Sequence, residues 1–445
     1  DSKWRITIGA VRHHFKSKVY NQTHHSRGME VTAAASSIAP IVEVLPGRLL
    51  WGPEDASGDR TNRLRALDLC RHGALDGITA GTYRIKHYSQ SAWGVAFGPL
   101  GVDSLLRFCR GLEAHLQSAK VVVLSTPKGD MEYRANAAVL LGAYLVLSHG
   151  WSSEKITSTL GTAEAGMTFP CSWSMVDCPS KQVMSVRDCW QGVVLAALHG
   201  WIDPDCVRND LKLSEACSTY DKQVTRFDTA WIIPGLLMVG ADPMTVIFDP
   251  NPATCSRLVP VAPGSATKSE SGPLSPVCSP ASTASMGAEE LLLSEWEEDE
   301  PGAGAREEEE VDFASFFAES GIGLVVRANP DCEPGSPGGR RYDDRAFAPY
   351  GLSQTQLHFK DQTAPMPQTV AHLLEACKDF MHGQRDDGVM IHCRAGFGRS
   401  VTLACCLAMA RLDVPGRALL GWVRIARPGA INARMQEIFL VRMKG

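Results

Sequence analysis

The 445-residue chain has no apolar run long enough to cross a membrane. Its longest stretch of this kind, AAVLLGAYLVL at residues 137–147, contains 11 residues, whereas a membrane-spanning helix needs about 20. The first 40 residues also lack the apolar segment of a secretory signal peptide. The sequence therefore predicts a protein without a membrane partner, located in the cytoplasm, the nucleus or both.

The 14 cysteines include no Cys-x-x-Cys pair, so the usual signature of a zinc site or a redox dithiol is missing. Their irregular spacing in a long chain is typical of reduced, buried thiols in an intracellular protein. No clear basic cluster for nuclear localisation is present. We expect no metal ion, no cofactor and no nucleic-acid partner.

The formal net charge of −5 is unevenly distributed along the chain. Residues 289–312 hold twelve carboxylates and one arginine, a local charge of −11, so the remainder of the chain carries +6. A mildly basic folded part suits an anionic substrate. The acidic segment itself fits either a solvated spacer or a docking segment for a partner protein.

Composition divides the chain into four parts. Residues 1–40 are polar, and residues 249–312 are rich first in Pro, Ser, Ala and Thr and then in Glu. Such segments cannot bury enough apolar surface to offset their ordering entropy, so we predict that both are disordered. Residues 41–248 and 313–445 are predicted to form two packed domains.

The second domain contains the clearest secondary-structure patterns. GVMIHC at 388–393 is typical of a buried strand, and RSVTLACCLAMARL at 399–412 and GRALLGWVRIAR at 416–427 are typical of helices. We also predict a strand at 321–328 and a helix at 369–381. Strands that alternate with helices indicate an α/β fold.

The strand, loop and helix at 389–412 have a weaker counterpart at 121–147. Each has an apolar strand, a Gly-containing loop, an arginine and an apolar helix. In the first copy Ser125 stands in place of the cysteine, and it is nine residues from Arg134, against six in the second copy. We infer two related domains, of which the first has kept the shape but lacks the cysteine.

The segment HCRAGFGRS, residues 392–400, combines an anion-binding loop with a nucleophile. A loop between a strand and a helix start can turn its backbone N–H groups inward around an anion, and Gly396 and Gly398 permit the tight curl. Arg399 supplies a fork matched to two phosphate oxygens. The same positive groups favour the thiolate of Cys393, which is the form that attacks phosphorus. The predicted substrate-binding residues of the loop are Arg394, Ala395, Gly396, Phe397 and Gly398.

Three further residues have predicted roles in phosphate transfer. Ser400 follows the arginine, and its hydroxyl is suited to donate to the sulfur when the phosphocysteine breaks down. The leaving oxygen needs a proton donor, and Asp361 is the best candidate because it follows a strand end on a loop closed by Pro365. His392 is expected to brace the loop by hydrogen bonds rather than to act as a base.

These residues resemble the active site of the cysteine-dependent protein phosphatases, and within them the dual-specificity phosphatases of the cell-division-cycle-fourteen (mitotic-exit) type. HCRAGFGRSVTL followed by GWVRIARPGAI is similar to that family's active-site loop, helix and following segment. DCWQGVVLAALHGWID at 188–203 and FDTAWIIPG at 227–235 are similar to stretches of its N-terminal domain. The resemblance covers residues 41–248 and 313–443. It implies two tandem dual-specificity-phosphatase-like domains, each a mixed sheet flanked by helices, the first of them catalytically silent.

The resemblance implies a phosphatase for phosphoserine, phosphothreonine and phosphotyrosine in proteins, with a preference for phosphoserine followed by proline and nearby basic residues, and a role in cell-cycle control. Gln436 falls where the family has a glutamine that orients the attacking water, although ARM and one extra residue replace the Gly-Pro before it. An acidic groove between the domains would read the basic residues of the substrate. The catalytic residues would be Cys393, Arg399, Asp361, Ser400 and Gln436, and the groove residues Glu215, Asp221 and Asp228.

Other functions with the same loop remain open. A phosphoinositide or RNA phosphatase would use the same cysteine chemistry, but phosphoinositide enzymes of this type often place lysines where this chain has Arg394 and Phe397. A flat-pocket RNA phosphatase would not need a silent first domain. A non-catalytic scaffold that binds phosphoproteins is the remaining alternative; the altered segment before Gln436 favours it, and the presence of Cys393 and Asp361 weighs against it.

Overall fold

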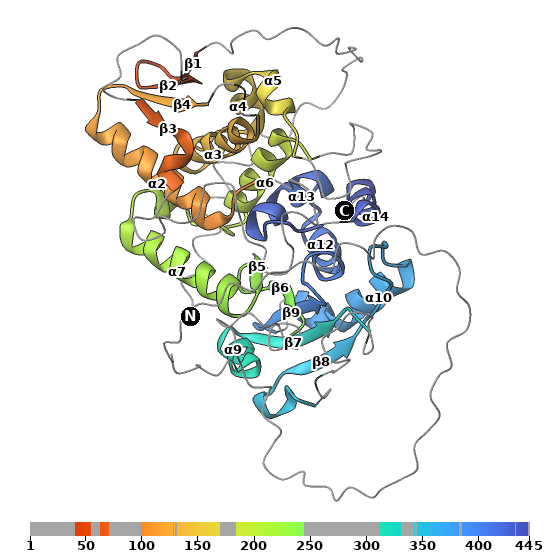
Figure 1. Cartoon of the computed structure of the whole chain (residues 1–445). Helices are drawn as coiled ribbons and strands as arrows, with labels where there is room; N and C mark the ends of the chain where they lie inside the picture. Colours follow the sequence, from red (N-terminus) through yellow and green to blue (C-terminus); the bar gives the residue numbers. More distant parts are fainter. Residues whose placement is uncertain are drawn as a thin grey trace, which may run out of the picture.

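The computed structural model describes residues 41–54, 63–70, 99–127, 129, 131–169, 184–243, 312–330, 342, 345–381, 385–431 and 433–443. The predictions of disorder for residues 1–40 and 249–311, and of partner docking through the acidic segment, lie outside these ranges. Within them the chain forms two mixed β-sheets flanked by helices, which confirms the predicted α/β class (Figure 1). No helix in these ranges has the length and apolar character needed to span a bilayer.

The first sheet has four strands in the order β1-β2-β4-β3. β2 and β3 flank β4 in parallel, and β1 pairs with β2 as an antiparallel edge. Helix α2 buries apolar residues at helical spacing, including Leu105, Phe108 and Leu112. The strands are β1 (Val42–Leu45), β2 (Leu49–Pro53), β3 (Arg63–Arg65) and β4 (Val122–Thr126). The helices of this half are α2 (Val102–Ser118), α3 (Met131–His149), α4 (Ser153–Leu160), α5 (Thr162–Gly166), α6 (Val186–Leu198) and α7 (Asp210–Arg226), with 3₁₀ turns η2 (Ala66–Cys70) and η3 (Pro204–Val207).

The second sheet has five strands in the order β5-β6-β9-β7-β8. Only the β5–β6 pair is antiparallel. β6, β7 and β9 are buried along their whole length, as strands in the middle of a covered sheet are. The strands are β5 (Thr229–Ile233), β6 (Leu237–Ala241), β7 (Ile322–Arg327), β8 (Ser353–Gln356) and β9 (Gly388–Cys393). The helices are α9 (Phe313–Glu319), α10 (Pro367–Ala376), α11 (Lys378–Met381), α12 (Arg399–Leu412), α13 (Gly416–Ala426) and α14 (Arg434–Arg442), with the 3₁₀ turn η7 (Ala348–Tyr350).

The predicted domain boundary at residue 248 does not separate the two sheets. β5 and β6 precede that boundary but pair with β9, which follows it by about 140 residues. The sheets are therefore divided before Thr229. The predicted boundary followed the change in composition near residue 250. Composition does not show how the strands pair, so it could not place β5 and β6 in the second sheet.

The secondary structure predicted for the second half agrees closely with the observed elements. The predicted strand 388–393 and helix 399–412 have the same bounds as β9 and α12. The predicted strand 321–328 corresponds to β7, and the helix predicted at 416–427 to α13. The helix predicted at 369–381 is divided at Cys377 into α10 and α11.

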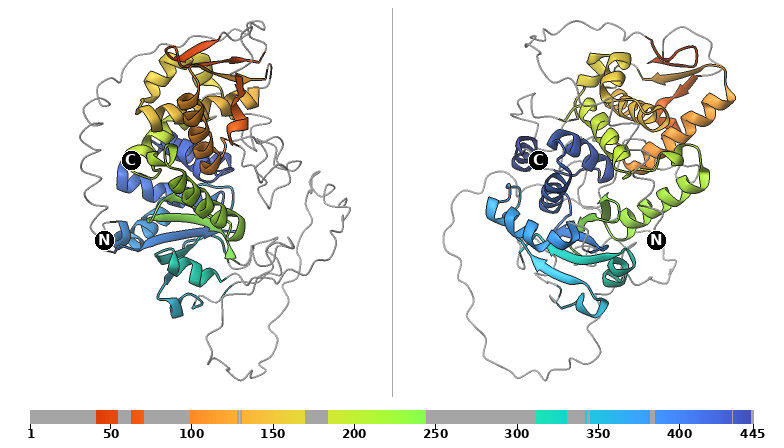
Figure 2. Two further views of the ribbon diagram at one scale, coloured as in Figure 1. Left: turned by 90° about the vertical axis from the view of Figure 1, so that its left-hand side faces the viewer. Right: turned by 180° about the vertical axis from the view of Figure 1, so that it is seen from behind.

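One apolar core joins the two sheets, and α6 lies against α13 within it (Figures 1 and 2). The two helices approach most closely at glycines. A Cβ on Gly192 would lie 2.4 Å from the backbone nitrogen of Trp422, and one on Gly421 would lie 2.2 Å from the carbonyl oxygen of Asp188. The indole of Trp422 also donates to the carbonyl of Ile232 in β5, at 2.8 Å. Helix α13 is therefore held by both halves of the chain.

Candidate active site

Cys393 is the last residue of β9, inside the second sheet. β9 pairs in parallel with β6 and β7, and Cys393 lies opposite Ala241 of β6. Cys393 is only 3% exposed. Helix α12 begins at Arg399, so residues 394–398 form a loop between an inner parallel strand and a helix N-terminus. Ligands of open α/β sheets bind at the carboxyl ends of such strands, and helix N-termini favour anions.

Gly396 allows this loop to lie directly on β6. Its φ of +71° is in the left-handed region, and a Cβ there would stand 2.2 Å from the carbonyl carbon of Gly240 and 2.5 Å from the backbone nitrogen of Ala241. Any side chain would therefore push one backbone away from the other. Gly398 has a φ of −100° and forms the N-cap of α12, so it does not need the left-handed conformation.

Four consecutive carbonyl groups of the loop accept hydrogen bonds from behind it. In a trans peptide, the carbonyl and the N–H of the next residue point in opposite directions. The N–H groups of residues 395–398 are therefore turned away from these supports, as an anion-binding loop requires. The donors are the backbone nitrogens of Asp242 and Ile431, which bond to Arg394 (3.1 Å) and Phe397 (2.7 Å), and the guanidinium of Arg427, which bonds to Ala395 (3.3 Å) and Gly396 (2.7 Å).

The predicted nucleophile and the predicted hydroxyl are in contact. Sγ of Cys393 is 3.4 Å from Oγ of Ser400, and Ser400 is fully buried. Arg399, between the loop and Ser400 in the sequence, is also buried. The structure thus brings these three residues together at the N-terminus of α12, where the helix dipole favours negative charge.

Asp361 approaches the same arginine from the segment between β8 and α10. Its Oδ1 is 3.3 Å from Nε of Arg399. The Asp361 side chain is 56% exposed and that of Arg399 only 2%, so Asp361 lies at the surface of the site and Arg399 in its interior. The carbonyl of Phe359 also accepts a hydrogen bond from Nη1 of Arg399, at 3.5 Å. A carboxyl group in this position suits the predicted role of proton donor to a leaving oxygen.

His392 lies beneath the loop and is fully buried. Its Nε2 is 2.5 Å from the hydroxyl of Tyr342, and its Nδ1 is 3.9 Å from Oδ2 of Asp242. Burial lowers the pKa of His392 to about 4; Asp242 opposes this shift and Arg327 adds to it. The imidazole is therefore neutral near pH 7. A buried, neutral ring fits the expected bracing role.

Asp228 does not line an exposed acidic groove, contrary to the sequence-based expectation. It is 8% exposed, and its Oδ1 accepts a hydrogen bond from Nη2 of Arg427 at 2.8 Å. Because Arg427 is itself bonded to the loop, Asp228 supports the loop rather than facing a substrate. A position in the sequence does not distinguish a buried carboxylate from an exposed one. Arg427 lies in the segment WVRIARPG, but no role for it follows from the sequence.

The other two groove candidates, Glu215 and Asp221, are exposed side chains on α7, and their binding role stays a prediction. Gln436 is fully buried in the first turn of α14, and neither of its amide atoms has a hydrogen-bond partner among the described residues. In this conformation the amide does not reach solvent, so orienting a water would require α14 to shift. The adjacent Met435 is 53% exposed. Successive helix positions point about 100° apart, so the extra residue before Gln436 decides which side chain faces outward.

The counterpart of this site in the first domain has different contacts. The hydroxyl of Ser125 donates to the carbonyl of Leu64 at 3.1 Å. Arg134 pairs with Glu164 at 2.6 Å and lies 4.4 Å from the ring centre of Trp51. The arginine charge is thus already matched by a carboxylate of the same domain. Together with the missing cysteine, this ion pair distinguishes the counterpart in the first domain from the Cys393 loop.

A phosphate bound at the Cys393 loop would be held by hydrogen-bond donors of the protein. Arg399, at the start of α12, and the N–H groups of residues 395–398 would be its donors. Within the ranges that the structure describes, no group of three or more His, Cys, Asp or Glu side chains is arranged to hold a metal ion.

Two stretches of the chain are similar to the cysteine-dependent, dual-specificity phosphatase class. Residues 85–196 match the family model "Dual specificity protein phosphatase, N-terminal half", and residues 303–411 match "Polymorphic toxin system, DSP-PTPase phosphatase". These two matches confirm the prediction of two tandem phosphatase-like domains.

Among the curated proteins of this class, the chain is similar to the CDC14 phosphatases, as its sequence predicted. It is 24% identical over 365 residues to "Tyrosine-protein phosphatase cdc-14" of Caenorhabditis elegans, covering 78% of this chain and 40% of that protein. It is 23% identical over 345 residues to "Dual specificity protein phosphatase CDC14A" of Mus musculus, covering 77% of this chain and 45% of that protein. The chain thus spans less than half the length of these curated relatives. A solved structure, "Crystal structure of Tk-PTP in the active form", is 24% identical over 29% of this chain and 87% of its own, with a TM-score of 0.25.

Proposed function

We propose that the chain is a protein phosphatase that hydrolyses phosphoserine, phosphothreonine and phosphotyrosine esters through a phosphocysteine. The observation that carries this proposal is the loop after β9, in which Cys393 lies at the base and four carbonyls are held back. The loop amides and Arg399 are suited to bind the phosphate oxygens. The relatives' names point to the same activity.

The reaction would proceed in two displacements at phosphorus. First, the thiolate of Cys393 attacks phosphorus, the P–O bond to the substrate breaks, and Asp361 gives its proton to the leaving oxygen. Second, a water attacks the phosphocysteine while the Asp361 carboxylate takes a proton from it. The P–S bond breaks, the thiolate is restored, and the hydroxyl of Ser400 donates to the departing sulfur. Inorganic phosphate is released and Asp361 is protonated again.

The proposed substrates are phosphoserine-proline sites with nearby basic residues, as in cell-cycle proteins. The exposed carboxylates of Glu215 and Asp221 on α7 support the basic preference, whereas Asp228 is occupied by Arg427. The cell-cycle role rests on the likeness to proteins named CDC14. We propose the cytoplasm, the nucleus or both as the location.

A second candidate function is binding of phosphoproteins without turnover. The buried, unpaired amide of Gln436 favours it, because the predicted orientation of the attacking water needs that amide at the site. The presence of Cys393 beside Ser400 favours the phosphatase instead, since binding alone requires no thiol.

Phosphate release from matched peptides tests these alternatives. A phosphoserine-proline peptide with lysine three residues on would be compared with a phosphotyrosine peptide, and the Cys393→Ser protein would be the control. Turnover that favours the Ser-Pro peptide and disappears in Cys393→Ser is expected. Tight binding of the peptide without turnover in the unmodified protein would replace the phosphatase by the binding function.

A further inference from the structure

Arg427 connects separate parts of the chain behind the catalytic loop. It is the C-cap of α13, and its guanidinium donates to the carbonyls of Gly396 and Ala395 at 2.7 and 3.3 Å. Its Nη2 also donates to Oδ1 of Asp228 at 2.8 Å. The guanidinium carbon lies 4.3 Å from the ring centre of Phe397, the next residue of the loop. These contacts are buried, because the Arg427 side chain is 3% exposed and that of Asp228 11%.

We propose that Asp228 and Arg427 form a positioning pair that holds the catalytic loop in its anion-binding shape. The proposal rests on the phosphatase function proposed above. Arg427 holds two of the four loop carbonyls that are turned back. If either peptide unit reversed, a carbonyl oxygen would face the phosphate in place of an N–H donor, and the anion would be repelled. Both residues act through the loop and not on the substrate.

The backbone of Asp228 is held in place by its neighbours, which directs its side chain at Arg427. It lies between α7 and β5 with a φ of +47°, a conformation that Asp and Asn tolerate better than most other residues. Its carbonyl accepts a hydrogen bond from the backbone nitrogen of Ala241, at 3.1 Å. Asp228 is therefore attached to the end of β6, the strand on which Gly396 rests. A buried guanidinium also needs a counter-charge, and Asp228 provides it.

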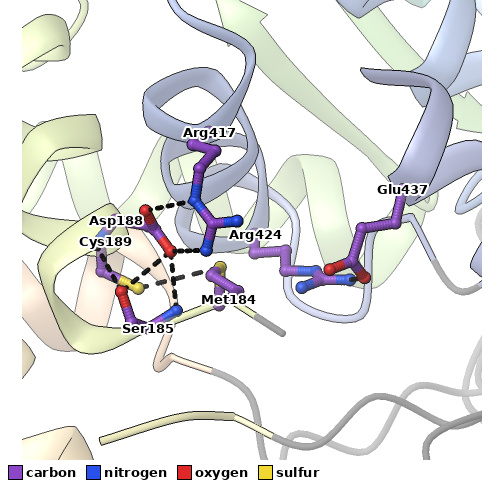
Figure 3. Close-up of polar contacts among 7 residues, drawn as sticks. All are labelled: Met184, Ser185, Asp188, Cys189, Arg417, Arg424 and Glu437. Carbon is purple, nitrogen blue, oxygen red and sulfur yellow. Dashed lines mark hydrogen bonds and ion pairs between the residues drawn. The ribbon is translucent and has the colours of Figure 1, made fainter. Parts of the chain in front are cut away.

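A hydrogen-bonded segment after α13 supports the same loop. Arg424 donates to the carbonyls of Ala430 and Ile431, both at 2.9 Å. It also pairs with the buried Glu437 at 3.0 Å, as Figure 3 shows. The backbone nitrogen of Ile431 in turn donates to Phe397. The segment at the end of α13 is thus hydrogen-bonded to the loop through Ile431 as well as through Arg427, so a change at Arg427 should alter the position of the loop.

A second ion pair, at the other end of α13, provides a matched control (Figure 3). Arg417 donates from Nε and Nη2 to the two oxygens of Asp188 in α6, at 2.9 and 2.7 Å. Asp188, like Asp228, comes from the first half of the chain and is buried. Ten residues separate Arg417 from Arg427, about 15 Å along a helix. Breaking this pair removes a partly buried contact between the halves at a distance from the loop.

The test compares Asp228→Asn, Arg427→Lys and Asp188→Asn in the full chain. Asparagine keeps the left-handed preference of residue 228 but removes its charge. Lysine keeps the charge of residue 427 but lacks the fork that reaches two carbonyls. The measurements are kcat/KM for p-nitrophenyl phosphate, the dissociation constant of inorganic tungstate as a phosphate mimic, and the melting temperature.

We expect Asp228→Asn and Arg427→Lys to lower kcat/KM about ten- to hundredfold and to weaken tungstate binding, because a displacement of about 1 Å can cost about a hundredfold in rate. Asp188→Asn should lower the melting temperature while leaving kcat/KM and tungstate affinity nearly unchanged. The proposal is overturned if the first two variants lower only the melting temperature, as the control does. An unmodified chain that binds tungstate without hydrolysing the ester would overturn the phosphatase function instead, and the variants' tungstate affinities would still decide the positioning role.

Discussion

At the scale of single residues, the contact between Ser400 and Cys393 concerns the second displacement of the proposed reaction. The hydroxyl lies 3.4 Å from the sulfur, and it stabilises most when the sulfur leaves phosphorus with a negative charge. Hydrogen bonds to charged groups are worth roughly 1.5–3 kcal/mol. In the first displacement the sulfur loses negative charge as it bonds to phosphorus, so that step should depend less on Ser400.

Ser400→Ala should lower steady-state kcat about ten- to hundredfold and leave a rapid first turnover. Stopped-flow measurement with p-nitrophenyl phosphate should show a burst of about one equivalent of phenolate, followed by slow turnover as the phosphocysteine accumulates. Ser125→Ala, at the position of the first domain that corresponds to Cys393, removes a buried hydroxyl far from the site and should leave kcat unchanged. Loss of the burst together with the steady-state rate would contradict the role of Ser400 in the second step.

The buried His392 should make the folded state sensitive to acid. Its pKa is about 4 in the folded protein against an ordinary value of 6.5, so below pH 6.5 the unfolded chain binds a proton that the folded chain does not. Stability is then fully present above pH 6.5 and falls as the pH approaches 4, by roughly 3 kcal/mol in all. Urea unfolding of the wild type and His392→Gln between pH 7 and 4 should show this loss in the wild type only. Parallel pH dependences of the two proteins would contradict it.

At the scale of elements, the sequence predicted the helices, strands and loops whose residues are adjacent in the chain. The bounds of β9 and α12 followed from the sequence because an apolar strand, a glycine loop and a helix start are adjacent in it. The loop around Asp361 by itself predicts a proton donor, and the structure brings Asp361 to Arg399. The pairing of Asp228 with Arg427 could not be predicted, because 199 residues separate them and neither has a local pattern that marks a buried ion pair.

The contact between α6 and α13 leaves no room for a side chain at Gly192. Gly192→Ala would place a Cβ 2.4 Å from the backbone of Trp422, so the helices must separate, at a cost of about 3 kcal/mol or more. Gly166→Ala, where a Cβ meets nothing within 4 Å, should be neutral or slightly stabilising. Thermal or urea unfolding measures both. Equal stability of the two variants would contradict the close contact of α6 with α13 at Gly192.

At the scale of the whole molecule, the two halves of the chain share one sheet. β5 and β6 come from before residue 244, and β7, β8 and β9 from after residue 311. The strand that carries Cys393 therefore has a neighbour from each half. The first half thus contributes directly to the site through β6, which supports Gly396, and through Asp228, which supports Arg427.

Residues 312–445 expressed alone should therefore fail to form the active fold. Without β6, one side of β9 is unpaired and the buried faces of both strands lose their cover. We expect weak circular dichroism, binding of an apolar dye and no turnover of p-nitrophenyl phosphate. Co-expression with residues 41–243 should restore turnover, since a strand can add to a free sheet edge through its backbone.

A matched variant separates strand addition from a general chaperone effect of the first fragment. In Gly240→Val, even the Cβ would lie 2.7 Å from Cγ2 of Thr229 and 2.8 Å from Cε of Met390 in β9. Because the valine side chain forces Thr229, Met390 or the backbone at Asp228 to move, β6 should pair poorly with β9, and the fragment 41–243 with this change should restore little turnover. Rescue by the variant fragment, or full activity of residues 312–445 alone, would mean that the catalytic half completes its sheet without β6. Restoration by the unmodified fragment only would make the first half a structural part of the active site.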